Sequence, residues 1–211
     1  MNCEENKSYL AHITEDCAYN QTIKEHLEGT AQLSAEFAKT FGCEEWGYCC
    51  GMLHDIGKYS EAFQKHIRGT EGIVDHATAG AQLCRDLKGF YVLLAYCIAG
   101  HHAGLPDTGA KSDDGRCKSM MGRLKKKIEP YDRFKSEIEI PSLRTFPFTS
   151  KYRGGEKDSA FVFSMLIRML FSSLVDADYL DTEKFMKQGN VLRNKGQSMD
   201  DLLKKAMQYV G

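Results

Sequence analysis

Residues 51–64 read GMLHDIGKYSEAFQ, a stretch that places a histidine, an aspartate and a lysine beside a run of apolar residues. The apolar and small residues from Trp46 to Leu53 have the helical spacing of a core face. His54 and Asp55 therefore lie at or beside the core, where an unpaired charge is costly. Two interpretations follow: a hydrogen-bonded pair within the core, or a pair of ligands for a cation.

The length and composition of the chain bound its class. With 211 residues, of which 42% are hydrophobic, it is long enough for one well-buried domain and short for two, so we expect a single domain over residues 1–211. The formal net charge of −1 means that nucleic-acid binding would need a local basic patch. There is no basic N-terminal segment followed by an apolar stretch and no long apolar run, so we expect a soluble, cytoplasmic protein without a membrane span.

Helical periodicity dominates the chain, so the predicted fold is all α or nearly so. We expect helices over residues 22–41, 44–56, 60–68, 75–87, 90–101, 118–137, 159–181 and 200–210. The segments 103–119 and 140–158 read as irregular, the second as a mobile connection. Residues 159–181 are apolar on nearly every face, which is typical of a central buried helix. Eight cysteines without a C-x-x-C pair favour reduced core thiols over disulfides.

Several histidines and acids fall at positions that this reading makes core-facing. They are His26, His54, Asp55, His76, His101, His102, Asp176 and Asp178. A hydrogen-bonded core histidine is the better explanation for any one of them alone, but together they favour a site for Mn, Fe, Co, Ni or Zn. Six or seven ligands suggest two metals that share a carboxylate, with Asp55 as the bridge. His12 and His66 read as surface or structural residues.

Five segments carry a resemblance to a known family. KEHLEGTAQLSAEFAKTFG, GMLHDIGKYSEAFQKHIRG, VDHATAGAQL, AGHHAGLPD and MLFSSLVDADYLDTE follow one another in the chain. In order and approximate spacing they resemble the HD superfamily of metal-dependent phosphohydrolases, and within it the HD nuclease domain of the CRISPR-associated helicase-nuclease of type I systems. The resemblance covers most of the chain and implies an all-α helical bundle with a metal site between core helices. Family members usually continue into a helicase, which residues 1–211 do not contain.

The resemblance also implies the ligands of one or two divalent transition metals. These ligands are His26, His54, Asp55, His76, His101, His102 and Asp178, and the metals are Mn, Fe, Co or Ni, with Mg or Zn also possible. The early histidine, the HD pair and the late aspartate hold one metal, while the HD aspartate, the third histidine and the paired histidines hold the other. Asp178 is preferred to Asp176 because it lies in the segment Ala-Asp-Tyr-Leu that the superfamily uses.

The catalytic residues implied by the resemblance are Asp55 and Lys58, with Lys58 near the substrate phosphate. The other interpretation of Lys58 is a solvated lysine just past a helix C-terminus, where the helix dipole favours a cation. The implied reaction is the hydrolysis of single-stranded DNA, in which metals activate water and polarise the scissile phosphate. The strand would be the one displaced by a CRISPR surveillance complex, with a helicase domain or subunit as partner.

Composition gives thinner support for DNA binding. A basic stretch over residues 116–134 contains aromatic residues and includes Lys125 and Lys126 as candidate substrate-binding residues. The loop SKYRGG at 150–155 is a second candidate. A solvated helix face explains the basic stretch equally well.

Two other functions use the same residues. A phosphohydrolase acting on nucleotides or cyclic nucleotides would have the same metal ligands but an enclosed pocket. A silent binding module would retain the fold without activity, although unused buried histidines and aspartates would lower its stability.

Overall fold

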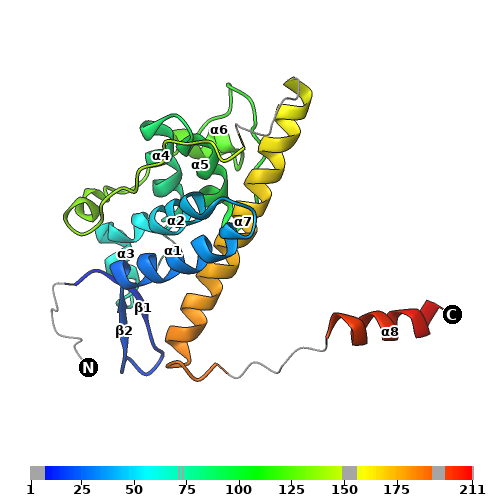
Figure 1. Ribbon diagram of the computed structural model, residues 1–211. Helices are drawn as coiled ribbons and strands as arrows, with labels where there is room; N and C mark the ends of the chain where they lie inside the picture. The colour runs from blue at the N-terminus through cyan, green and yellow to red at the C-terminus, as the bar shows by residue number, and fades with distance from the viewer. Residues whose placement is uncertain (1–7, 71, 73, 149–155, 192–197, 211) are drawn as a thin grey trace.

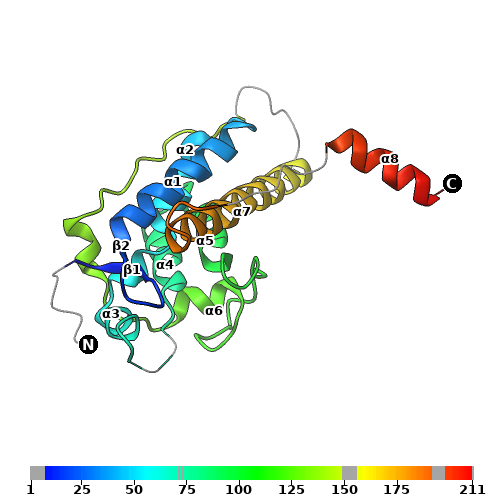
Figure 2. The same ribbon diagram turned by 90° about the horizontal axis from the view of Figure 1, so that it is seen from below.

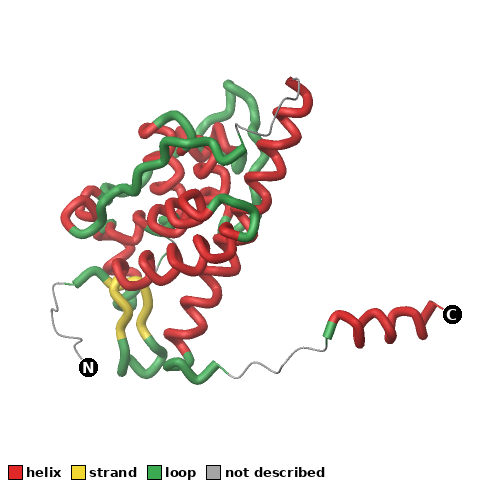
Figure 3. Tube along the Cα trace, in the orientation of Figure 1, coloured by secondary structure: helices red, strands yellow, loops and turns green. Residues whose placement is uncertain are grey.

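The computed structural model describes residues 8–70, 72, 74–148, 156–191 and 198–210. Within them the chain forms eight α-helices and one two-stranded sheet, which confirms the all-α class (Figure 3). The helices are α1 (Ile23–Lys39), α2 (Glu44–Leu53), α3 (Glu61–His66), α4 (Ala77–Leu87), α5 (Tyr91–Gly100), α6 (Met120–Lys125), α7 (Glu156–Met186) and α8 (Met199–Val210). Figure 1 shows α7 running beside the other helices and α8 standing apart from them.

The small sheet was not predicted. Strand β1 (Leu10–Ile13) pairs antiparallel with β2 (Asn20–Thr22), and both are too short for a pattern of alternating residues to reveal them. The residue that ends β2, Thr22, also begins α1. Its hydroxyl accepts a hydrogen bond from the Glu25 backbone, and the Glu25 carboxylate accepts one from the Thr22 backbone, which is a capping box. The sheet is therefore joined directly to the start of α1.

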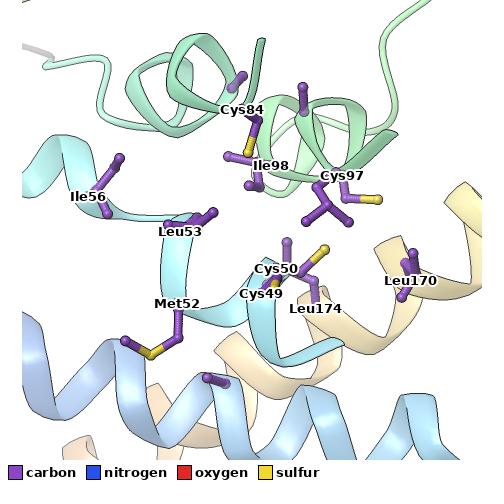
Figure 4. Close-up of a cluster of buried hydrophobic side chains, with 14 of the residues drawn as sticks. Cys49, Cys50, Met52, Leu53, Ile56, Cys84, Cys97, Ile98, Leu170 and Leu174 are labelled. Atoms are coloured by element: carbon purple, nitrogen blue, oxygen red, sulfur yellow. The ribbon is translucent and has the colours of Figure 1, made fainter. Parts of the chain in front are cut away.

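The core lies where α2, α4, α5 and α7 meet. Figure 4 shows Cys50 and Leu53 of α2 facing Ile98 of α5, with Leu170 and Leu174 of α7 closing the cluster. Most of the predicted core thiols are here or nearby, because Cys43, Cys49, Cys50, Cys84 and Cys97 are buried and free. Burial raises the pKa of the Cys49 thiol to about 12, so it stays protonated. The prediction fails for Cys17 and Cys117, which are exposed, and Cys3 lies outside the described residues.

Helix α7 differs from the predicted central buried helix. Only one face is buried, through Leu166, Leu170 and Leu174, while Phe161 is 67% exposed. The reason is that its neighbours, chiefly α1, α5 and α2, cover it from one side (Figure 2). The segment Asp158–Met186 is also long and apolar enough to cross a membrane by length and composition, although the sequence predicted no membrane span. The same length and composition suit a helix that packs its leucine face on a protein core.

Two other predicted helices are interrupted. The one expected over 44–56 ends at Leu53, and a 3-10 turn, Ile56–Tyr59, follows it. The one expected over 118–137 consists of α6 and a separate 3-10 turn, Asp132–Ser136, because Lys126 adopts an extended conformation and Pro130 lacks a backbone donor.

The irregular segment predicted over 140–158 is described only to residue 148 before α7 begins, and residues 149–155 lie outside the described residues. Its described part is tied to the core. The Tyr91 hydroxyl donates to the Pro141 carbonyl at 2.5 Å, and Trp46 Nε1 donates to the Thr145 carbonyl at 3.1 Å.

We predict that Gly51→Ala lowers the free energy of unfolding by about 1–3 kcal/mol, the usual effect of overpacking. A Cβ atom at Gly51 would lie 2.3 Å from Ala31 Cα, so α1 and α2 would have to separate. Urea denaturation monitored by circular dichroism measures the change. Gln32→Ala, at an exposed position of α1, is the matched control and should leave stability nearly unchanged. Equal stability of both variants would show that the helices do not pack this closely.

Candidate metal centre

Five helices bring their polar side chains to one point. His26 lies on α1, and Asp178 lies on α7. His54 and Asp55 follow α2 directly, and Asp55 leaves the helical conformation with φ −116° and ψ 19°. The remaining ligands lie at the start of α4 (His76) and just after α5 (His101, His102). All seven predicted ligands are thus placed together.

The first group of ligand atoms, which we call the inner set, is His26, His54, Asp55 and Asp178. His26 Nε2 lies 3.5 Å from Asp55 Oδ2 and 3.3 Å from Asp178 Oδ1. His54 Nε2 lies 3.4 and 3.7 Å from the same two oxygens. The side chains of His26, His54 and Asp55 are at most 1% exposed, and that of Asp178 is 17% exposed. The inner set is therefore almost closed to solvent.

The second group, the outer set, is Asp55, His76, His101 and His102. Here the other carboxylate oxygen is used: Asp55 Oδ1 lies 3.2 Å from His101 Nε2 and 3.5 Å from His76 Nε2. His102 Nε2 lies 2.8 Å from His76 Nε2, so the two rings point to the same place. Unlike the inner set, this set includes an exposed residue, His102. Asp55 offers one oxygen to each set, which is the arrangement that a bridging carboxylate requires.

The tautomers of these histidines are fixed by their backbone partners. The Nδ1 atoms of His54 and His101 lie 2.8 and 2.7 Å from the carbonyl oxygens of Gly51 and Ile98. The Nδ1 atom of His76 lies 3.2 Å from the Val74 carbonyl. A carbonyl oxygen only accepts, so Nδ1 carries the proton in each neutral ring. Each Nε2 lone pair is then free to face the centre, as metal ligation requires.

Unpaired polar atoms show that the centre suits a cation. The buried atoms His26 Nε2, His54 Nε2, His101 Nε2 and both Asp55 oxygens have no hydrogen-bond partner. Lys58 Nζ lies 2.7 Å from Asp55 Oδ2 as an ion pair, but not at a hydrogen-bond angle. Buried polar groups are normally satisfied, and nitrogen and carboxylate donors without thiolates suit divalent transition metals. The residues present therefore fit one or two such ions.

The pKa values of the carboxylates reflect their surroundings. Burial alone would raise the pKa of Asp55, but Lys58, His54 and His76 outweigh it and hold that pKa well below the usual range. Burial likewise opposes ionisation of Asp178, yet the neighbouring imidazoles of His26 and His54 lower its pKa strongly. Both carboxylates are therefore ionised at neutral pH, as ligands of a cation must be.

The pKa values of two histidines, one from each set, are shifted in opposite directions. Burial lowers the pKa of His26, but the neighbouring carboxylates of Asp178, Asp181 and Asp55 outweigh it and raise that pKa to about 10. In the outer set, burial and the neighbouring His101 lower the pKa of His102 to about 4. A proton thus competes for the inner set over the neutral range and scarcely for His102.

Two further residues lie at the centre in surroundings that the sequence did not predict fully. They are Lys58 and His12. Lys58 is only 4% exposed, so it is not a solvated lysine. His12 of β1, predicted to be a surface or structural residue, lies beside the centre. Its Nε2 is 3.4 Å from Lys58 Nζ, and its ring meets that of His26 edge-on with centroids 4.7 Å apart. No spacing in the sequence indicates this contact, because β1 reaches the centre only through the tertiary fold. His66 is exposed.

A second acid of α7 was also missed. Asp181 is 8% exposed, and its Oδ2 atom lies 2.8 Å from His26 Nδ1. Its spacing of three residues from Asp178, on the same helix face, was the available signal. Asp176, the alternative to Asp178, is exposed and belongs to neither set.

The predicted substrate-binding lysines are not part of the centre. Lys125 Nζ donates to the carbonyl oxygens of Lys111 and Asp113, and Lys126 Nζ forms a 2.6 Å ion pair with Asp75. Asp75 in turn accepts from the backbone and hydroxyl of Thr78, which fixes the start of α4 next to His76. Through these contacts Lys125 stabilises the loop at residues 111–113, and Lys126 stabilises the start of α4. The role of both lysines in substrate binding stays a prediction.

We predict that Asp178→Asn weakens metal binding while Asp176→Asn does not. Asp178 supplies a carboxylate oxygen to the inner set, whereas Asp176 lies two residues away on the exposed face. Titration calorimetry of the EDTA-stripped protein with Mn²⁺ would measure this. The loss for Asp178→Asn should exceed the about 10- to 100-fold typical when only a partner of a ligand is removed. Equal loss in both variants would contradict the assignment of Asp178.

We predict that the metal-free protein loses stability as the pH rises from 7 to 8. The pKa of His26 is about 10 in the folded protein and near 6.5 when unfolded, so its contribution is complete below pH 6.5 and declines above it. The expected loss is on the order of 1 kcal/mol per pH unit, measured by urea denaturation in EDTA. His26→Gln should flatten this dependence. A wild-type stability that does not change over this range would show that His26 is not protonated.

Comparison with known proteins agrees with this centre. No curated protein matches the sequence. The model of the HD domain family matches residues 23–138, more than half of the chain and including every ligand except Asp178. Since members of this family are helical, metal-dependent phosphohydrolases, the chain belongs to the HD domain family and is a metal-dependent hydrolase.

Proposed function

We propose that the protein is a nuclease that hydrolyses the phosphodiester bonds of single-stranded DNA. The observation that carries this proposal is the openness of the outer set. His102 is exposed, whereas the side chains of His26, His54 and Asp55 in the inner set are at most 1% exposed. An open face suits a long strand that passes across the metals, whereas an enzyme of mononucleotides encloses its ligand.

A pocket beside this open face supports an anionic substrate. The segment 103–107, which follows His102 directly, lines a hollow of about 330 Å³ together with Lys118, Ser119 and Arg123. Its cationic side chains, Lys118 and Arg123, outnumber its one carboxylate, Asp107. A hollow with an excess of positive charge in the segment that follows His102 suits a neighbouring phosphate of the strand.

Other parts of the predicted basic stretch do not support strand binding. Phe134 is 1% exposed, and Tyr131 stacks on it with ring centroids 5.7 Å apart, so Phe134 does not offer a face to a base. Arg116 is paired with Asp114. The second candidate loop, SKYRGG at 150–155, lies outside the described residues. The proposal therefore rests on Lys118 and Arg123 within this stretch.

The chemistry of hydrolysis divides between the metals and the protein. Divalent ions, when bound, supply the positive charge that polarises a phosphate and acidifies water. Asp55 holds both sets through its two oxygens. Lys58 Nζ, beside Asp55 and next to His12, is the donor that we propose for a phosphate oxygen of the substrate. No protein side chain needs to act as a covalent nucleophile.

We extend the proposal to antiviral CRISPR interference of type I from the resemblance of the five segments alone. In this setting a helicase domain or subunit supplies the strand that a surveillance complex displaces, and the reaction takes place in the cytoplasm. The proposal of Mn, Fe, Co or Ni as the metal follows from the donor types of both sets.

The decisive experiment follows a long, labelled single strand after EDTA treatment and addition of Mn²⁺, Fe²⁺, Co²⁺, Ni²⁺ or Mg²⁺. We expect metal-dependent cleavage by the wild type, loss of cleavage in Asp55→Ala, and retention in Asp176→Ala. Duplex DNA, deoxynucleotides, cyclic nucleotides and bis(p-nitrophenyl) phosphate are tested in parallel. Hydrolysis of nucleotides with no cleavage of DNA would replace the nuclease by the nucleotide phosphohydrolase.

A matched pair of charge reversals tests the open face. Lys118→Glu lines the proposed strand path, whereas Lys39→Glu lies on an exposed part of the last turn of α1. We expect Lys118→Glu to raise KM for the single strand by roughly 3- to 10-fold, the effect of about 1 kcal/mol of binding free energy. Hydrolysis of bis(p-nitrophenyl) phosphate should stay unchanged. An equal effect of both variants would show that the hollow has no special role.

A further inference from the structure

We propose that Asp181 is a positioning residue that orients His26 and makes the inner set the tighter of the two metal sites. Asp181 does not belong to either set of candidate ligands. Its Oδ2 atom lies 2.8 Å from Nδ1 of His26, on the side of the ring away from the centre. The inference rests on the metal centre and not on the identity of the substrate.

His26 differs from the other buried histidines in what holds its Nδ1 atom. His54 and His101 use the carbonyl oxygen of a residue three positions earlier in the chain. Such a contact is local and carries no net charge. His26 instead uses a carboxylate 155 residues later in the chain. A carboxylate behind a ligating histidine fixes the ring and raises the basicity of its metal-facing nitrogen.

Asp181 is itself held in place by the small sheet. Gln21 of β2 is 8% exposed, and its Nε2 atom donates to Asp181 Oδ2 at 2.8 Å. Gln21 directly precedes Thr22, which is the N-cap residue of α1. The Asp181 carboxylate is therefore bound both by the sheet, through Gln21, and by the first turns of α1, through His26. The amide therefore fixes the orientation of Asp181, and Asp181 in turn fixes that of His26.

A glycine makes room for this carboxylate. A Cβ atom on Gly29 would lie 2.1 Å from Asp181 Oδ1, so any other residue there would displace it. Gly29 lies one turn after His26 on α1, which brings α7 close enough for Asp181 to reach the ring. Gln21, Gly29 and Asp181 come from three separate parts of the chain and serve the same contact.

The distribution of charge explains why the inner set should bind more tightly. Asp55 and Asp178 supply two carboxylates to it, with Asp181 behind, whereas Asp55 is the one carboxylate of the outer set. The inner set is also more enclosed, so its charges are less screened by water. Removal of Asp181 should therefore affect the inner set selectively.

The test is calorimetric titration of EDTA-stripped protein with Mn²⁺, which needs no substrate. We expect two binding events in the wild type. Asp181→Ala should weaken the tighter event by about 10- to 100-fold and leave the weaker one within about twofold. Asp176→Ala, on the exposed face of the same helix, should bind as the wild type does.

Asp181→Asn keeps the shape of the side chain and an oxygen that accepts from Nδ1, so it separates orientation from charge and guards against misfolding of the alanine variant. We expect partial recovery of the tighter event.

Three outcomes would overturn the inference. They are unchanged affinities in both Asp181 variants, equal weakening of both events, and selective weakening of the looser event. If the wild type binds no Mn²⁺, the metal centre itself is wrong and the proposed function fails with it. If the wild type binds two ions and cleaves DNA while Asp181→Ala does the same with unchanged affinities, the inference alone fails.

Discussion

The buried charge of Asp55 is the constraint on which the rest of the structure depends. A carboxylate with no exposed surface is strongly unfavourable unless cations or hydrogen-bond donors surround it. Here four imidazoles and the ammonium of Lys58 lie within 3.5 Å of its two oxygens. These groups come from α1, the end of α2, the 3-10 turn that follows it, the start of α4 and the end of α5. The helices must therefore converge on Asp55, and the close contact of Gly51 with Ala31 allows the first two to do so.

The break in the chain after α2 gives the centre its two-sided form. In a continuous helix, consecutive side chains diverge by about 100°, so His54 and Asp55 would not share a centre easily. The helix instead ends at Leu53, and the non-helical conformation of Asp55 brings both side chains to the same point. Each Asp55 oxygen then faces a different set of histidines. One side is closed by α1 and α7, and the other opens past His102, where a substrate can approach.

The partners of the Nδ1 atoms, on the side of each histidine ring away from the centre, differ from one ligand to another. Backbone carbonyls from the preceding helical turn orient His54 and His101, so the local fold sets these rings without further help. His26 is the fourth residue of α1, where the carbonyls of the preceding residues, Thr22 and Ile23, already accept hydrogen bonds of the helix itself. It needs a partner from elsewhere, and Asp181 of α7 supplies it. This requirement ties the small sheet, α1 and α7 into one unit around the inner set.

Helical periodicity and the cost of buried polar groups are local signals, so the sequence by itself determined the helical class and most of the histidines and acids that meet at the centre. The resemblance of the five segments added the preference for Asp178. Tertiary structure decided the rest. It buried Lys58, brought His12 and Asp181 to the site, and left one face of α7 exposed. The physical reason is that a residue's surroundings depend on which distant segments cover its face. Spacing along one helix predicts which face a side chain lies on, but only the packing between helices decides which residues that side chain contacts.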